Sequence, residues 1–96
     1  MTVVAITTDL MDRSRITGAL DDVRVVRPGG DLSGATAVLV DLSLPDALED
    51  AVASGARVIG YGSHVDDTVL TDARAKGAEA LPRSVFFRRL GEGTLL

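Results

Sequence analysis

Five short apolar runs constrain the fold of this chain more than any other feature of its sequence. Continuous runs of this kind are typical of strands buried on both faces of a parallel sheet. Segments with helical spacing follow most of them, and strands that alternate with helices form a parallel sheet with helices on both faces. We therefore predict an α/β domain that residues 1–96 form as a single unit. The predicted strands are Val3–Ile6, Val23–Val26, Ala37–Val40, Val58–Tyr61 and Ala78–Leu81.

Four segments are predicted to be helices. The first is Met11–Leu20, where Ile16, Ala19 and Leu20 share one face and Asp12 lies in the first turn. Glycine beyond the last periodic residue is typical of a helix end. On that basis the second helix is predicted to begin at Ser43 and to end before Gly55. The third is predicted to begin at Asp66-Asp67 and to end before Gly77. The fourth is predicted to begin at Ser84 and to end before Gly91.

The link between the second and third strands differs from the others because it has no helical pattern. It runs from Pro28 to Gly34 and is rich in glycine. A stretch of this length is long enough to return along a short strand, so we predict an irregular loop in place of a crossover helix. The preceding Val23-Arg24-Val25 alternates apolar and basic residues, which is typical of a half-exposed edge strand.

Composition excludes several classes of protein. The chain has no cysteine, so it forms no disulfide and has no thiolate nucleophile, and a cytoplasmic location is expected. No apolar run approaches the length of a membrane span, and the N-terminal run lacks the basic region of a signal peptide. A net charge of −4 argues against non-specific binding of nucleic acid. We therefore expect neither a membrane nor a nucleic acid as partner.

Common catalytic and cofactor-binding motifs are absent. The glycine-rich fingerprint of dinucleotide-binding proteins would follow the first strand, where Thr7-Thr8-Asp9 stands instead. His64 is the single histidine, so one chain cannot form a multi-histidine metal site, and the adjacent Ser63 is not expected to form a catalytic dyad with it. Because no set of nucleophile, base and orienting group can be named, we do not expect an enzyme and expect no cofactor.

Asp41 is the main candidate for a functional residue. It ends the third apolar run and is followed by Leu42-Ser43-Leu44-Pro45. In open parallel sheets, functional sites lie at the carboxyl ends of the strands. The sequence therefore places a carboxylate where chemistry would be expected.

With these features, the chain resembles the receiver domain of bacterial two-component response regulators over nearly its whole length. The matching residues are Val3–Ile6 with Arg13 beyond it, Val38–Pro45, Val58-Ile59 and Gly77-Ala78. The resemblance implies a flavodoxin-like three-layer sandwich with strand order 2-1-3-4-5, in which the helix after the second strand is missing here. It also implies that Asp41 falls at the position of the phospho-accepting aspartate.

The magnesium site of the family is not preserved. Receivers carry an acidic pair after the first strand, where this chain has Thr7 and Thr8, with Asp9 one position beyond. A carboxylate attracts Mg²⁺ by roughly 8 kcal/mol at 4 Å and an effective dielectric constant of about 20, and two hydroxyl groups cannot replace this attraction. We expect no bound metal unless Asp9 turns inward, in which case Asp9 and Asp41 would be its ligands.

Other positions of the receiver pocket also depart from the family. Gly62 aligns with the family's serine or threonine, with Ser63 adjacent, and Ser84 aligns with its lysine, with Arg83 as the nearest cation. Without metal, lysine and hydroxyl group, phosphoryl transfer to Asp41 loses the positioned charge on which it depends. We therefore favour a structural role for Asp41, either paired with Arg83 or accepting backbone N–H groups of the following loop.

These features favour an atypical receiver, or pseudo-receiver, that acts in signalling through a protein partner. Two alternatives remain: a phospho-accepting receiver that uses Asp41 and Mg²⁺, and a domain that binds a small anion. The residues expected around such an anion are Arg83, His64 and the backbone amides near Ser43 and Ser84.

The resemblance implies a partner face within residues 66–90, where Phe86 and Phe87 stand together, and a homodimer is left open. Consecutive helix positions cannot both point to the core centre, so one phenylalanine could be partly exposed, although we favour core positions for both. Arg83, Arg88 and Arg89 are predicted to interact with a helix C-terminus rather than to bind phosphate.

Overall fold

A parallel sheet forms the centre of the molecule. The computed structural model describes residues 2–63 and 67–96. Within these residues, five strands form one all-parallel sheet in the order β2-β1-β3-β4-β5. The predicted flavodoxin-like α/β fold is therefore confirmed. The strands are β1 (Val3–Ile6), β2 (Val23–Val26), β3 (Ala37–Asp41), β4 (Arg57–Gly62) and β5 (Glu79–Pro82).

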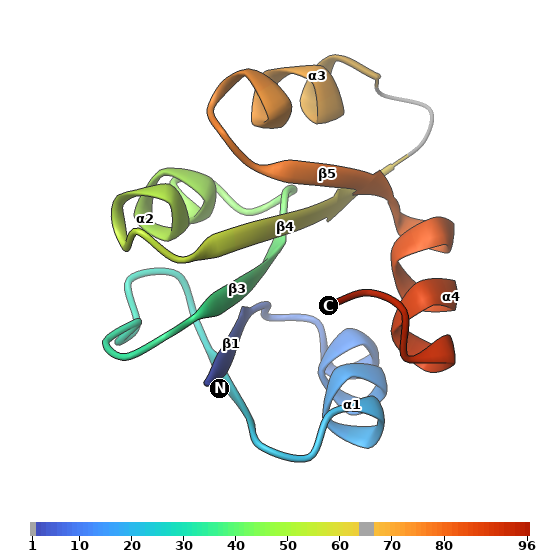
Figure 1. Ribbon diagram of the computed structural model, residues 1–96. Coiled ribbons are helices and arrows are strands. Elements are labelled where there is room, and N and C mark those ends of the chain that lie inside the picture. The colour runs from blue at the N-terminus through green and yellow to red at the C-terminus, as the bar shows by residue number, and fades with distance from the viewer. Residues whose placement is uncertain (1, 64–66) are drawn as a thin grey trace.

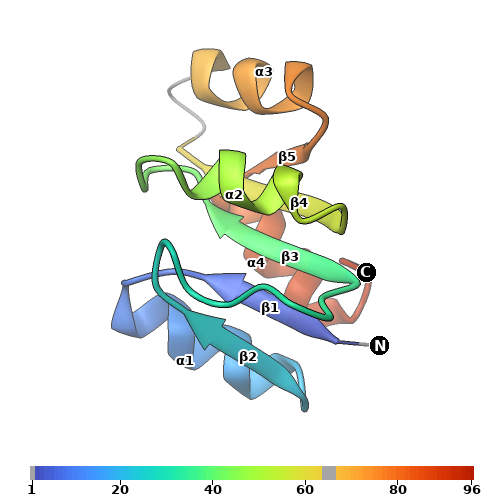
Figure 2. The ribbon, with the colours of Figure 1, turned by 90° about the vertical axis from the view of Figure 1, so that its left-hand side faces the viewer.

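Helices cover both faces of this sheet and complete three layers (Figures 1 and 2). The helices α1 (Leu10–Ala19) and α4 (Arg83–Glu92) share a core with one face, to which Leu39 and Tyr61 contribute. The helices α2 (Ala47–Ala53) and α3 (Asp67–Ala75) share a second core with the other face, to which Val38 and Val40 contribute. Successive strand residues point to opposite faces, so one apolar run supplies both cores.

The link from β2 to β3 is an irregular loop, as predicted from its sequence (Figure 2). The guanidinium group of Arg24 donates hydrogen bonds to the carbonyl oxygens of Asp31 and Ser33, at 3.0 and 3.1 Å. Leu32 and Ala35 pack against the core on the α2 and α3 side. The loop therefore covers the part of the sheet that a crossover helix would cover. β2 is an edge strand with partly exposed residues, which confirms its prediction.

Three helices begin at other residues than predicted, and one of them is α4, which starts at Arg83 rather than Ser84. α1 starts one residue early, at Leu10, and buries only Asp12 and Ile16, whereas Ala19 is exposed. α2 starts at Ala47, several residues after Ser43, because Ser43 instead forms hydrogen bonds with the side chain of Asp41. The residue before α2 is in the left-handed region and makes no side-chain cap. The predicted start of the third helix at Asp66 lies outside the described residues.

The last helix corrects the predicted role of Arg83 and extends beyond the predicted end. Arg83 is its first residue, so this arginine does not lie at a helix C-terminus. Only Arg89 fits that prediction, since it lies in the last turn and donates to the carbonyl oxygen of Thr94 at 3.1 Å. The helix ends at Glu92 and is followed by Gly93 with φ of 75°.

Phe86 and Phe87 are both buried, with 0% and 4% of their surfaces exposed. Core positions for both are therefore confirmed, and the alternative that one of them is partly exposed is wrong. They meet edge to face, with ring centroids 5.0 Å apart. None of the described helices combines the length and the apolar character that a bilayer crossing needs.

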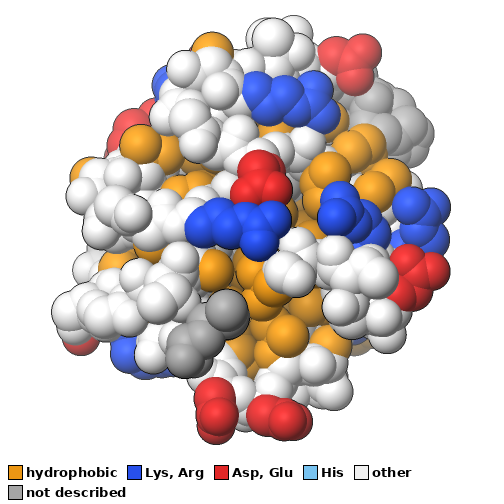
Figure 3. Space-filling view, viewed as in Figure 1, with side chains coloured by type: hydrophobic (Ala, Val, Ile, Leu, Met, Phe, Trp, Pro, Cys, Tyr) orange, Lys and Arg blue, Asp and Glu red, His pale blue; other side chains and the backbone are white. Residues whose placement is uncertain are grey.

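Charged side chains are scattered over the face shown in Figure 3. Basic and acidic groups are mixed on this face, and several charged side chains of the described residues form ion pairs. An example is Arg57, whose Nε and Nη2 donate to the carboxylate of Glu79 at 2.6 and 2.8 Å. The described part of this face has no continuous basic surface of the kind that binds a nucleic-acid backbone.

Candidate functional site at the carboxyl edge of the sheet

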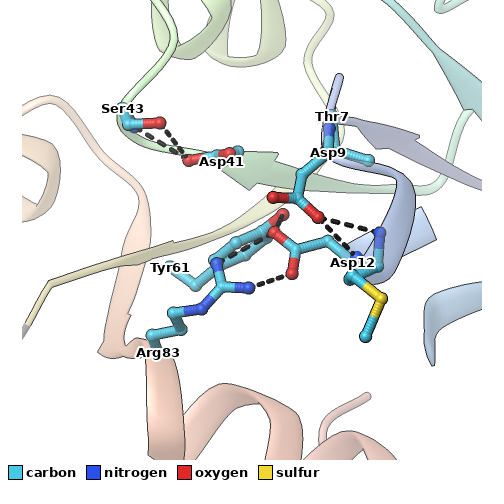
Figure 4. A network of polar contacts seen from close by, with 8 residues as sticks. Thr7, Asp9, Asp12, Asp41, Ser43, Tyr61 and Arg83 are labelled. Carbon is cyan, nitrogen blue, oxygen red and sulfur yellow. Dashed lines mark hydrogen bonds and ion pairs between the residues drawn. The ribbon is translucent and has the colours of Figure 1, made fainter. Parts of the chain in front are cut away.

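Asp41 ends β3 at the carboxyl edge, beside Tyr61 of β4. Its side chain is largely buried, with 9% of the residue exposed. Oδ1 accepts hydrogen bonds from the backbone amide of Ser43 at 3.0 Å and from its hydroxyl group at 2.7 Å (Figure 4). The predicted bond to a backbone N–H group of the following loop is therefore confirmed. The alternative pairing of Asp41 with Arg83 is wrong, because Arg83 binds another carboxylate.

That carboxylate belongs to Asp12, which has no exposed surface. Two nitrogens of Arg83 bind its two oxygens: Nη1 donates to Oδ2 at 2.8 Å, and Nη2 donates to Oδ1. The hydroxyl group of Tyr61 also donates to Oδ2, at 3.1 Å. Figure 4 shows the three side chains pointing toward one another from α1, α4 and β4, apart from the pair of Asp41 and Ser43. A buried charge requires such partners, so this network fixes all three residues.

Arg83 is held in place by more than this ion pair. Its guanidinium group lies 5.5 Å from the ring centroid of Tyr61 and 5.0 Å from that of Phe87, within the range of cation–π attraction. Hydrogen bonds to the Asp12 carboxylate raise the pKa of Arg83 above its usual value. Arg83 is therefore a fixed and permanent positive charge, and its Nη1 and Nη2 groups donate their hydrogen bonds to Asp12.

Tyr61 is kept neutral by its surroundings. Burial raises the pKa of its hydroxyl group well above the usual value, and the nearby charges of Asp41 and Asp12 act in the same direction. Its ring packs on Phe86 and Phe87, with centroid distances of 4.4 and 5.1 Å. At neutral pH the tyrosine is thus a hydrogen-bond donor fixed by packing, and it points at Asp12.

The residues after β1 form a helix cap rather than a metal site. Thr7 is buried, and its Oγ1 accepts a hydrogen bond from the backbone amide of Asp9 at 3.2 Å. Oδ1 of Asp9 accepts from the backbone amides of Met11 and Asp12, at 2.8 and 3.0 Å. This is the geometry of an N-cap side chain, which satisfies amides that the helix leaves free.

The residues at this edge do not fit the magnesium ion that the receiver resemblance implies. Mg²⁺ is held by carboxylates and water in near-octahedral geometry. Here Asp9 caps α1, Asp41 binds Ser43, and Asp12 binds a guanidinium group. In the part of the chain that the structure describes, no three acidic or imidazole side chains converge closely enough to hold a metal ion.

The remaining predicted pocket residues are Gly62, Ser63, Thr8 and Ser84. Gly62 ends β4, and a Cβ atom added to it would meet the side chains of Leu42, Leu70 and Val69 at 3.6 Å. Ser63, Thr8 and Ser84 are exposed, and Ser84 lies in the first turn of α4.

The structure brings Asp41 and Arg83 close enough for their charges to interact. The prediction that includes His64 lies outside the described residues.

Sequence reasoning missed Asp12 and Tyr61 as site residues. The sequence did indicate that Asp12 is buried, because Asp12 precedes Ile16 by four positions and therefore lies on the same helix face as Ile16. An acid on an apolar face needs a buried partner. Tyr61 ends the fourth apolar run and lies opposite Asp41 in the parallel register. Arg83 was considered as a partner of Asp41, of a helix C-terminus and of a small anion, but not as the partner of Asp12.

Comparison with known proteins adds no relative. No family model matches the chain, and no curated protein or solved structure matches it. The resemblance to receivers thus rests on the residues described above and on the strand order of the sheet.

Proposed function

We propose that this chain is a receiver-like signalling module that acts in the cytoplasm through contact with a protein partner and does not run a phosphorylation cycle at Asp41. The strand order and the place of Asp41 at the end of β3 support the receiver-like part of the proposal. The ion pair between Arg83 and Asp12 supports the absence of a phosphorylation cycle.

The commitment of Arg83 to Asp12 carries this proposal. Phosphoryl transfer depends on positive charge placed around the transferred group. Arg83 is the cation closest in sequence to the family's lysine position, but both oxygens of a buried carboxylate bind it. Removing one partner from a buried ion pair costs about 3–5 kcal/mol. A rearrangement that turned Arg83 toward a phosphoryl group would leave Asp12 as a buried charge without its ion-pair partner. The cost in free energy would be comparable.

Asp41 itself is also engaged. Its Oδ1 accepts two hydrogen bonds from Ser43, which lowers its availability as a nucleophile. The acidic side chain that could assist a metal ion, Asp9, serves as the cap of α1. Each component of the receiver reaction that remains in the sequence thus has a structural role in the fold.

Treatment with a phosphodonor tests this proposal. The protein is incubated with Mg²⁺ and acetyl phosphate, and its intact mass is measured, with a phospho-accepting receiver as positive control. We expect no phosphoryl adduct on this chain while the control is modified. An adduct on the wild-type protein that disappears in Asp41→Asn would show that Asp41 accepts phosphate and would overturn the proposal. Structural change on adding beryllofluoride and Mg²⁺ would have the same meaning.

The partner surface must consist of residues other than Phe86 and Phe87, since both are buried. The first turn of α1 carries the two most exposed large apolar side chains of the described residues, Leu10 at 78% and Met11 at 73%. They lie at the carboxyl edge, beside the cap formed by Asp9. We place the partner contact there, because exposed apolar side chains gathered at one place mark interaction sites.

Photo-crosslinking in cells tests this surface. A photoreactive residue at position 10 is expected to give a discrete crosslinked protein, and one at Val52, which is 36% exposed on α2, is expected to give none. Equal yields at both positions would remove the assignment without affecting the phosphodonor result.

The alternative of an anion site around Arg83 is not favoured. The guanidinium group already binds Asp12 and lies over two aromatic rings. An anion would compete there with a buried carboxylate that the fold holds in place.

A further inference from the structure

A separate hollow lies at the carboxyl edge, on the other side of β1 from Asp41. It has a volume of about 200 Å³ and is bordered by the ends of β1 and β2 and by the first turn of α1. Two arginines line it, Arg13 from α1 and Arg27 from the residue that follows β2, together with the exposed Thr8. The hollow shares none of its lining with the network of Asp12, Tyr61 and Arg83.

The two arginines of this hollow differ from all other arginines in the described part of the chain. Neither guanidinium group forms an ion pair, a hydrogen bond or a ring contact within residues 2–63 and 67–96. The others have carboxylate, carbonyl or aromatic partners, namely Arg15, Arg24, Arg57, Arg74, Arg83, Arg88 and Arg89. The unpaired charge of the described arginines is therefore gathered at one place.

This placement is unfavourable for the protein alone. Two like charges that border one small hollow repel each other, and the rest of the chain carries a net negative charge that could have supplied partners. The acid that borders the hollow is Asp9, whose Oδ1 is bound by two amides of α1. An external anion would relieve the repulsion, and guanidinium groups bind oxyanions through two parallel hydrogen bonds.

We propose that this hollow binds a phosphoryl-type oxyanion, held by the guanidinium groups of Arg13 and Arg27 with the hydroxyl group of Thr8 beside them. The volume of the hollow is several times the roughly 30 Å³ share of one water molecule, which suits a single tetrahedral group rather than a nucleotide. The amides at the start of α1 take no part, because Asp9 already caps them. This inference does not depend on the proposed signalling function.

A phosphate titration followed by amide NMR shifts tests the site. Inorganic phosphate is added to the whole chain at constant ionic strength, with chloride as the replaced ion. We expect saturable shifts centred on Thr8, Arg13 and Arg27. No saturable shift, an equal response to chloride, or shifts centred on Arg83 and Ser43 would each overturn the assignment.

Variants make the test specific. Arg13→Gln and Arg27→Gln should each weaken phosphate binding about tenfold or more, because each removes a charged donor. Both residues are exposed, so the fold should be unchanged. The matched control is Arg88→Gln on α4, which should leave the affinity unchanged. Equal weakening in the control would mean unspecific attraction and would contradict the proposal.

Asp9→Asn gives a prediction in the opposite direction. Asparagine caps a helix about as well as aspartate, so α1 should keep its start. Removal of the negative charge that borders the hollow should make phosphate bind several-fold more tightly. Unchanged or weaker binding would contradict the proposed location of the anion.

The source of the phosphoryl group is distinguished in a last comparison. Inorganic phosphate and a short phosphoserine peptide are titrated in parallel. Equal affinity would identify a free anion as ligand, and tighter binding of the peptide would identify a phosphorylated protein segment. Binding of neither would overturn the proposal.

Discussion

The carboxylate of Asp12 is buried completely, and residues from two other elements bind it. Arg83 supplies the charge and Tyr61 supplies a third hydrogen bond. The attraction between the two charges is not the main effect of this network, because the cost of transferring both charges out of water offsets much of that attraction. Its effect is that any single change leaves a buried charge or a buried donor without a partner.

Loss of the arginine should destabilise the fold strongly. We expect Arg83→Met to lower the free energy of unfolding by about 3 kcal/mol, near the lower end for buried ion pairs because part of Arg83 remains in water. Urea denaturation measures the change. The double variant Asp12→Asn with Arg83→Met should recover most of the loss, because no uncompensated charge remains. If the double variant is as unstable as the single one, the penalty does not come from Asp12.

The neutral state of Tyr61 should make stability sensitive to alkali. The pKa of this tyrosine is raised in the folded state, whereas an unfolded tyrosine ionises near pH 10, at about its ordinary pKa. Above that pH the unfolded state holds fewer protons than the native state, so stability should fall as the pH rises further. Because the chain has one tyrosine, the ultraviolet absorbance of tyrosinate reports this group alone. Ionisation near pH 10 without unfolding would contradict the assignment.

Tyr61→Phe separates the hydroxyl group from the ring. We expect a loss of about 1–2 kcal/mol at neutral pH, because Asp12 loses one hydrogen bond while the packing on Phe86 and Phe87 is kept. The part of the alkaline sensitivity that comes from tyrosine ionisation should disappear in this variant. Thermal unfolding at a series of pH values measures both effects.

At the scale of the elements, the close packing of β4 against the loop after β3 sets the position of Asp41. Leu42 follows Asp41 and covers Gly60, where an added Cβ atom would come within 2.6 Å of Leu42 Cδ2. The same loop is tied to β4 by the hydrogen bond from the amide of Leu42 to the carbonyl oxygen of Tyr61, at 2.9 Å. The missing side chain of Gly60 thus allows the loop after β3 to pack closely on β4.

Two glycines of one strand provide a matched test of this contact. Gly60→Ala should destabilise the fold by about 1 kcal/mol, because Leu42 must move. Gly62→Ala should be neutral or slightly stabilising, since its added Cβ would meet its neighbours at the ordinary distance of 3.6 Å. Chemical denaturation of the two variants checks the difference. Equal stabilities would show that Leu42 yields without cost.

The sequence predicted the existence of each element better than its beginning. The capping preference of serine pointed to a helix start at Ser43, but the side chain of Asp41 was a closer partner for the same hydroxyl and amide groups. Asp9 was considered as a metal ligand, whereas its spacing to the amides of α1 makes it a cap. In both cases a local hydrogen bond decided between two roles that the residue type permits.

For the whole molecule, the alternation of strands and helices together with the receiver resemblance was sufficient to predict the strand order. The pairing of Asp12 with Arg83 was not predictable in the same way, because a periodic pattern shows which face of an element is buried and not which side chains meet there. Separate elements, α1 and α4, contribute the two residues, and their contact depends on how both helices pack on one sheet face.

The layered arrangement predicts a gradient of local stability across the sheet. All residues of β3 are buried, and the strand is paired on both sides, whereas β2 is a partly exposed edge strand next to a loop. We expect the backbone amides of β3 to exchange with solvent at least about tenfold more slowly than those of β2. Hydrogen exchange under native conditions measures this ratio. Similar rates would indicate that the sheet opens as one unit.

The ion pair of Asp12 and Arg83 also has a consequence for synthesis on the ribosome. The two residues are 71 positions apart, and Asp12 belongs to α1, which emerges before α4. Until the start of the last helix has left the exit tunnel, the acid on the first helix has no guanidinium group to neutralise it. Helix α1 must then remain undocked, or dock with a buried carboxylate that has no partner, until α4 emerges.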